Sequence, residues 1–135
     1  LNRNGSAQGK LIGGNLSVLA GMIGTPFDLP YDGNILFIEE IAEKPYHIDR
    51  MMQNLRLSGA LANISGLVVG QFSYCEEDPL MMQSIAEIIH DAVKEYQYPV
   101  CFNFPAGHVD YNLPLVMGEN LKLDISNSLS TIYYL

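Results

Sequence analysis

Cysteine is scarce in this chain of 135 residues, which carries only Cys75 and Cys101. Two cysteines are too few for the disulfide framework that holds many small secreted domains together. Cys101 lies in the apolar run Pro99-Val100-Cys101-Phe102, where a buried free thiol is the ordinary expectation. Because 48% of the residues are hydrophobic, we expect one domain whose core needs neither disulfides nor metal.

Basic residues are also few, with 7 Lys and Arg against 15 Asp and Glu, which gives a net charge of −8. The sequence has no basic stripe, so we expect no nucleic-acid partner. No apolar run approaches the ~20 residues that a membrane helix needs, so we expect no membrane partner. No signal peptide is visible, and residues 1–9 are polar, so we interpret them as a linker or an added terminal segment before a domain over 10–135.

Several motifs of metal, phosphate and nucleophile sites are missing. There is no HExxH, no CxxC, no phosphate-binding loop and no GxSxG, so we expect no metal and no cofactor. His108-Val109-Asp110 is an HxD triplet without an evident third ligand, and a metal site around it is the weakest alternative that we keep. Ser17 is the best local candidate for a nucleophile, and its context is poor.

The hydrophobic pattern that is present predicts an α/β domain with a mixed sheet and about three helices. Short apolar runs predict strands over 10–14, 34–39, 66–70 and 99–104, and alternation predicts a C-terminal hairpin of 121–125 with 130–135. Helical periodicity predicts helices over 16–23, 45–57 and about 78–96, the last being the longest. Asn15 is expected to cap the first helix and Pro45 to begin the second.

Ionisable side chains follow two of these strands. Glu39 and Glu40 end the strand 34–39, and His108 follows the strand 99–104. Open α/β sheets bind ligands beyond the carboxyl ends of their strands, so a carboxylate and an imidazole from these positions can meet there. The carboxylate would then hold one ring nitrogen and leave the other free as a base. Ordinary structural or solvated roles remain an alternative for all three residues.

Three ordered motifs resemble a known family. They are Gly13-Gly14-Asn15-Leu16-Ser17-Val18-Leu19, then Ile35-Leu36-Phe37-Ile38-Glu39-Glu40 with Tyr46 and Asp49-Arg50, and then Gly107-His108 with Leu113-Pro114-Leu115 and Gly118. Together they look like the C-terminal domain of the LD-carboxypeptidases, the muramoyltetrapeptide carboxypeptidases of serine peptidase family S66. The resemblance covers about residues 10–135, and its implied fold is the family's swivelling β/β/α domain.

The resemblance implies a serine carboxypeptidase that releases the terminal D-Ala of murein tetrapeptides during cytoplasmic cell-wall recycling. The family's nucleophilic serine belongs to an N-terminal domain, which this chain would need as a partner. The triad acid falls on Glu39 and the histidine on His108. The family's second acidic position is Asp, and here it is Glu40, which leaves open which of the two side chains faces the site. Alternation along a strand puts the two on opposite faces.

Two other readings stay open. A relative in the same family is an immunity protein that hydrolyses an aminoacyl-nucleotide antibiotic, and a non-catalytic peptide-binding module could keep the same fold. If the enzyme reading holds, the isolated chain should be inactive because it lacks the nucleophile. The surface that meets the N-terminal domain should be apolar, and the isolated chain is expected to form a homodimer through it.

Overall fold

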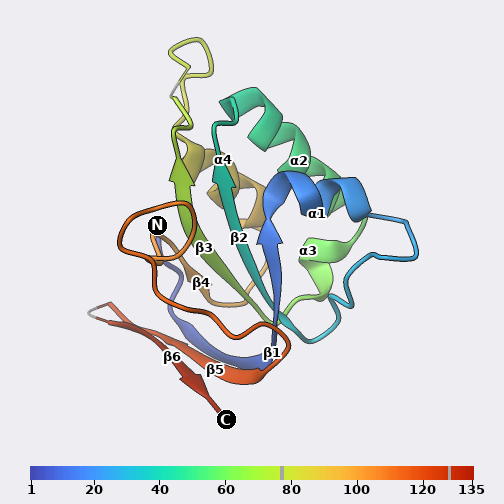
Figure 1. Cartoon of the computed structure of the whole chain (residues 1–135), viewed down its shortest axis with the longest axis vertical. Coiled ribbons are helices and arrows are strands. Elements are labelled where there is room, and N and C mark those ends of the chain that lie inside the picture. Colours follow the sequence, from blue (N-terminus) through green and yellow to red (C-terminus); the bar gives the residue numbers. More distant parts are fainter. Residues whose placement is uncertain (77, 128) are drawn as a thin grey trace.

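A computed structural model describes residues 1–76, 78–127 and 129–135. It shows one six-stranded mixed sheet with helices packed on one face (Figure 1). The strands are β1 (Gly5–Asn15), β2 (Ile35–Ile41), β3 (Gly66–Ser73), β4 (Val100–Cys101), β5 (Asn120–Ile125) and β6 (Ser130–Tyr134). The helices are α1 (Leu16–Met22), α2 (Pro45–Leu57), α3 (Ala60–Asn63) and α4 (Ile85–Val93).

The strand order is β4-β3-β2-β1-β5-β6, and the two halves of the sheet differ in direction. The pairs β1–β2, β2–β3 and β3–β4 are parallel, whereas β1–β5 and β5–β6 are antiparallel. The long strand β1 joins the halves, since residues 5–10 pair with β5 and residues 11–15 pair with β2. The carboxyl ends of β1, β2 and β3 therefore meet at one edge of the molecule.

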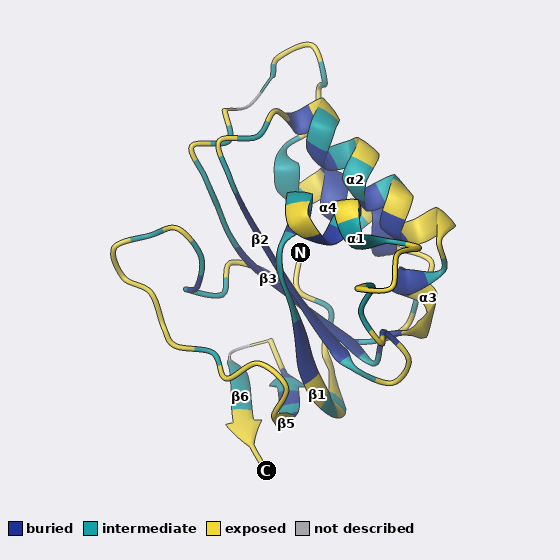
Figure 2. Ribbon diagram, turned by 45° about the vertical axis from the view of Figure 1, so that its right-hand side comes forward, coloured by how far each residue is buried: buried dark blue, intermediate teal, exposed yellow. Residues whose placement is uncertain are grey.

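Two hydrophobic clusters cover the two faces of the sheet. The larger joins α1, α2 and α4 to one face, with Leu36, Ile38, Met52 and Ile89 among its members. The smaller lies under the curled antiparallel part and contains Phe37, Leu121 and Leu123. Figure 2 shows the burial concentrated in the central strands and on the inner sides of the helices. The predicted α/β fold with layers of helices, sheet and curled sheet is thus confirmed, with α3 as a fourth, short helix.

Three predicted boundaries were wrong. The first strand begins at Gly5 rather than Lys10, so residues 5–9, which we interpreted as part of a linker, belong to the sheet. The helix predicted over 78–96 is only α4, which makes α2 the longest described helix. The strand predicted over 99–104 is reduced to β4.

Local signals at the helix starts agree with the structure. The side chain of Asn15 accepts a hydrogen bond from the Val18 N–H and caps α1, and Pro45 lies in the first turn of α2. Ser84 and Glu87 form a capping box at the start of α4. None of the described helices has the length and apolarity that crossing a membrane would need.

Candidate active site

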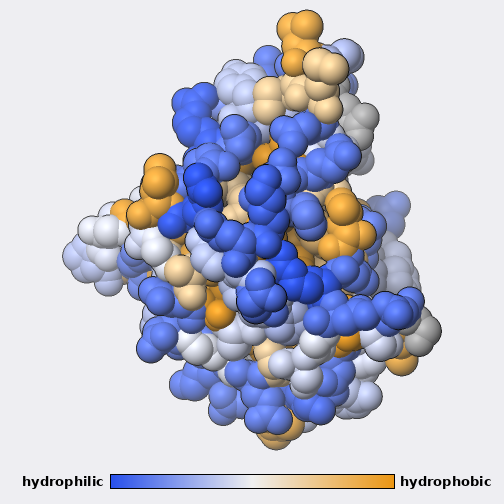
Figure 3. Space-filling view, turned by 180° about the vertical axis from the view of Figure 1, so that it is seen from behind, coloured by the Kyte–Doolittle hydropathy of each residue, from blue (hydrophilic) through white to orange (hydrophobic). Residues whose placement is uncertain are grey.

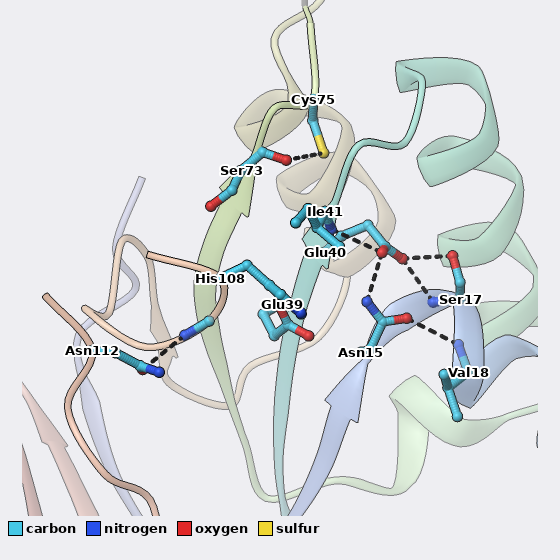
Figure 4. Close-up of polar contacts among 11 residues, drawn as sticks. Asn15, Ser17, Val18, Glu39, Glu40, Ile41, Ser73, Cys75, His108 and Asn112 are labelled. Atoms are coloured by element: carbon cyan, nitrogen blue, oxygen red, sulfur yellow. Dashed lines mark hydrogen bonds and ion pairs between the residues drawn. The ribbon is translucent and has the colours of Figure 1, made fainter. Parts of the chain in front are cut away.

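Glu39 lies at the carboxyl end of β2 and points away from the helices (Figure 4). Glu39 as a whole residue is 6% exposed, so its carboxylate is largely shielded from water. In the register of the sheet Glu39 is opposite Asn15, the last residue of β1. The register between β2 and β3 shifts between Ile38 and Glu40, which is an irregularity centred on Glu39.

The loop after β4 brings His108 to the same place. The Phe104 N–H donates to the Val69 carbonyl of β3. The Gln71 N–H of β3 donates in turn to the Ala106 carbonyl, so two hydrogen bonds tie the start of this loop to β3. The Gly107 N–H donates to Asn112 Oδ1 at 3.2 Å, so Asn112 closes the turn that carries His108. Asn112 was not among the predicted site residues, because an Asn in a loop has no spacing signal of its own.

The two side chains meet through one hydrogen bond. Nδ1 of His108 is 2.7 Å from Oε2 of Glu39, and the His108 side chain is 51% exposed. Since a carboxylate only accepts hydrogen bonds, Nδ1 is the donor of this pair. The other ring nitrogen, Nε2, is then the proton acceptor of the neutral ring. The structure therefore brings together the two residues that the sequence singled out, with the acid buried and the imidazole accessible.

A shallow hollow of about 420 Å³ lies beside this pair. Its walls are mostly apolar and come from Gly14, Phe37 and the loop residues 106–107 and 112–117, with Glu39 and His108 at one side. Glu39 and His108 are the only ionisable side chains among its described lining residues. The hollow is therefore suited to uncharged parts of a ligand.

Glu40 leaves β2 on the opposite side, toward the start of α1 (Figure 4). Oε1 accepts from Asn15 Nδ2 at 2.6 Å and from the Ile41 N–H at 2.9 Å. Oε2 accepts from the Ser17 N–H at 2.8 Å and from the Ser17 hydroxyl at 2.6 Å. Burial alone would raise the pKa of Glu40, but these hydrogen bonds outweigh it and hold the pKa below its usual range. Glu39 is therefore the acid that meets His108, and Glu40 is not.

Ser17 is not placed as a nucleophile. Its hydroxyl donates to Glu40, whose lowered pKa makes it a poor base, and Figure 4 shows Ser17 on the side of β2 away from His108. The other histidines lie on helices, where His47 Nδ1 pairs with Glu43 at 2.7 Å and His90 lies near Asp91. Within 1–76, 78–127 and 129–135 no three His, Cys, Asp or Glu residues are grouped so that they could hold a metal, and this includes His108 and Asp110.

Comparison with known proteins assigns the domain. The family model described as the LD-carboxypeptidase C-terminal domain matches residues 8–123. A Bacillus subtilis (strain 168) protein named "Probable murein peptide carboxypeptidase" is 33% identical over 131 residues, which are 95% of this chain and 40% of that protein. The crystal structure of muramoyltetrapeptide carboxypeptidase from Oxalobacter formigenes superposes with a TM-score of 0.84 at 32% identity and covers 93% of this chain and 43% of that one.

A third relative is named for a different function. The Escherichia coli microcin C7 self-immunity protein MccF is 28% identical over 126 residues, covering 92% of this chain and 36% of that protein. The chain thus spans less than half the length of the relatives that it matches. Both the family model and these relatives extend over nearly the whole chain, and so this chain belongs to the LD-carboxypeptidase family and corresponds to its C-terminal domain.

Proposed function

We propose that this chain is the C-terminal half of a serine carboxypeptidase that releases the terminal D-Ala from murein tetrapeptides by cutting an L–D peptide bond. The observation that carries the proposal is the 2.7 Å contact between Nδ1 of His108 and Oε2 of the buried Glu39. This is the arrangement of a base and its orienting acid in a catalytic triad. The names of the Bacillus and Oxalobacter relatives support murein peptides as the substrate class.

In this proposal the nucleophilic serine comes from a separate N-terminal domain, which the short coverage of the relatives supports. Nε2 of His108 takes the serine proton as Oγ bonds to the scissile carbonyl carbon, and Glu39 stabilises the imidazolium that forms. Collapse of the tetrahedral intermediate breaks the C–N bond, and Nε2 returns the proton to the departing D-Ala amine. Water then hydrolyses the serine ester by the same proton transfers, which restores the enzyme. The reaction would take place in the cytoplasm.

The test measures D-Ala release from a murein tetrapeptide by the full-length protein that contains this chain. Glu39→Gln keeps the shape of the acid but removes its charge, and His108→Ala removes the base. We expect both to lower kcat by about a thousandfold or more. The matched controls are Glu43→Gln and His47→Ala, which break a pair with the same 2.7 Å distance between Glu43, just before α2, and His47 in its first turn, and they should keep near wild-type rates. An active wild type whose Glu39 and His108 variants keep full rate would contradict the assignment of the two residues.

The second candidate is hydrolysis of an aminoacyl nucleotide, as in an immunity protein, and the similarity to MccF favours it. A structure of MccF in complex with glutamyl sulfamoyl guanosine superposes on this chain with a TM-score of 0.81 at 26% identity. The same Glu39–His108 pair would serve both substrates. Parallel assays with a murein tetrapeptide and an aminoacyl sulfamoyl nucleoside distinguish them. If the full-length protein hydrolyses neither, a peptide-binding module becomes the better account.

A further inference from the structure

Glu40 is a buried carboxylate that the proposed mechanism does not use. Its residue is 2% exposed, and its two oxygens accept four hydrogen bonds from three residues. Four donors match the roughly four acceptor sites of one ionised carboxylate, so the buried charge is fully hydrogen-bonded. The donors also lie on two different segments, the corner between β1 and α1 and the end of β2. Glu40 therefore ties these two segments together.

The tied segments are the ones that hold Glu39. Asn15 is the neighbour of Glu39 on β1, whereas on the other side the register with β3 shifts between Ile38 and Glu40. Glu39 therefore has its regular strand pairing with Asn15 on β1 and not with β3. The side chain of Asn15 in turn donates to Oε1 of Glu40, and its Oδ1 accepts from the Val18 N–H. Figure 4 shows these contacts on one side of β2 and Glu39 on the other.

We propose that Glu40 is a positioning residue for the Glu39–His108 pair, because its hydrogen bonds fix the end of β2 against the β1–α1 corner and keep Glu39 aimed at His108. The consequence for catalysis rests on the proposed function, but the positioning itself can be measured without any substrate. An amide cannot replace the carboxylate here. In Glu40→Gln one of the two oxygens becomes an NH2 group, which faces either Asn15 and Ile41 or Ser17, and all of these offer hydrogens.

The test reads the tautomer of His108 in the 135-residue chain by ¹⁵N NMR above the pH at which the ring is protonated. The bond to Glu39 holds the hydrogen on Nδ1, whereas a free imidazole favours Nε2–H, so loss of the bond shifts the tautomer ratio. Glu39→Gln is the reference for a lost bond, and we expect it to lower the ratio of the Nδ1–H to the Nε2–H tautomer by about tenfold. His108→Ala assigns the signals among the three histidines. Glu40→Gln should lower the ratio by at least about threefold while the backbone amide spectrum stays native-like.

The matched control is Glu43→Gln, because Glu43 holds Nδ1 of His47 at the same 2.7 Å distance. It should change the tautomer of His47 and leave that of His108 as in the wild type. Ser17→Ala is the milder variant if Glu40→Gln does not fold, since it removes one of the two bonds to Oε2 and should shift His108 in the same direction. Native-like amide spectra with a wild-type His108 tautomer in Glu40→Gln, or in Ser17→Ala if Glu40→Gln does not fold, would overturn the proposal. Because no reaction is measured, the outcome is independent of D-Ala release.

Discussion

Gly107 is the residue whose lack of a side chain lets Glu39 and His108 approach. Its φ is +135°, and a Cβ atom there would lie 3.2 Å from the Gln71 carbonyl oxygen and 3.3 Å from both Cβ and Oε2 of Glu39. Gly107→Ala should therefore combine backbone strain with a clash against the acid. We expect it to lower the free energy of unfolding by about 1–3 kcal/mol in urea denaturation and to shift the His108 tautomer away from Nδ1–H.

Gly118→Ala is the control that separates backbone strain from the clash with Glu39 in Gly107→Ala. Gly118 also has a positive φ, +84°, but a Cβ atom there would meet nothing within 4 Å. This variant should lose about 1 kcal/mol of stability through backbone strain alone and keep the wild-type tautomer of His108. If Gly107→Ala also keeps that tautomer, the close approach of the loop is not needed for the pair.

Only part of this site could be predicted from the amino-acid sequence. Glu39 and His108 could be predicted because each follows an apolar strand, and because they fall on motifs that resemble the family. The resemblance placed the acid on Glu39, but alternation alone could not decide between Glu39 and Glu40, since it puts them on opposite faces without saying which face holds His108. Three of the four bonds of Glu40 come from Asn15 and Ser17, which lie 23 to 25 positions away, and the Asn112 contact lies within an irregular loop, so neither has a recognisable spacing in a single sequence.

At the scale of elements, Arg3 attaches the N-terminal segment to the end of α4. Its guanidinium donates to the carbonyl oxygens of Val93 at 2.9 Å, Tyr96 at 2.6 Å and Tyr98 at 3.3 Å. A cation suits this place because carbonyl oxygens at the carboxyl end of a helix carry partial negative charge. Arg3→Ala should lower the free energy of unfolding by about 1.5–3 kcal/mol in urea denaturation.

Arg56→Ala is the matched control on the same side of the molecule. Arg56 pairs with Glu95 at 3.5 Å, and both side chains are largely exposed, so its loss should cost no more than about 0.5 kcal/mol. Equal effects of the two substitutions would show that Arg3 adds nothing beyond a surface charge.

Two of the mispredicted elements were decided by contacts that residue composition does not show. Residues 5–9 lack an apolar run, yet they form strand because β5 supplies antiparallel partners for Gly5, Ala7 and Gly9. The acidic residues Glu76, Glu77 and Asp78 favoured an early start for the last helix, and Glu77 lies outside the described residues. The capping box of Ser84 and Glu87 starts it at Ile85 instead. Tertiary partners and local capping outweighed composition in both places.

At the scale of the whole molecule, exposed apolar residues occur in two separate places near the carboxyl ends of the strands. One is the loop between β3 and α4, where Leu80 and Met82 are about 90% exposed, and Figure 3 shows apolar side chains at its tip above a mostly hydrophilic face. The other is the loop beside the candidate site, where Leu113, Val116 and Met117 are exposed. Homodimer formation through such a surface stays a prediction, which sedimentation at increasing concentration would test.

Acid should destabilise the whole fold, and Glu40 makes a separable contribution. Its pKa is lowered in the folded state, so it adds stability at pH values above its unfolded pKa, and that contribution disappears as the pH falls through the folded pKa. The exposed Glu87, Asp91 and Asp124 also have lowered pKa values and act in the same direction. Comparing wild type with Glu40→Gln removes their effect, because both proteins keep them.

The difference in Tm between wild type and Glu40→Gln should therefore be constant from about pH 9 to pH 6 and should shrink below about pH 5. The physical reason is that protonated Glu40, like Gln, turns a donor toward Asn15 or Ser17, so the two proteins come to face the same mismatch. Thermal unfolding followed by circular dichroism at each pH gives the measurement. A difference that stays constant down to about pH 3 would contradict a charge-based role for Glu40, because the stabilising contribution of a carboxylate with a lowered pKa must fall once the unfolded carboxyl group is protonated.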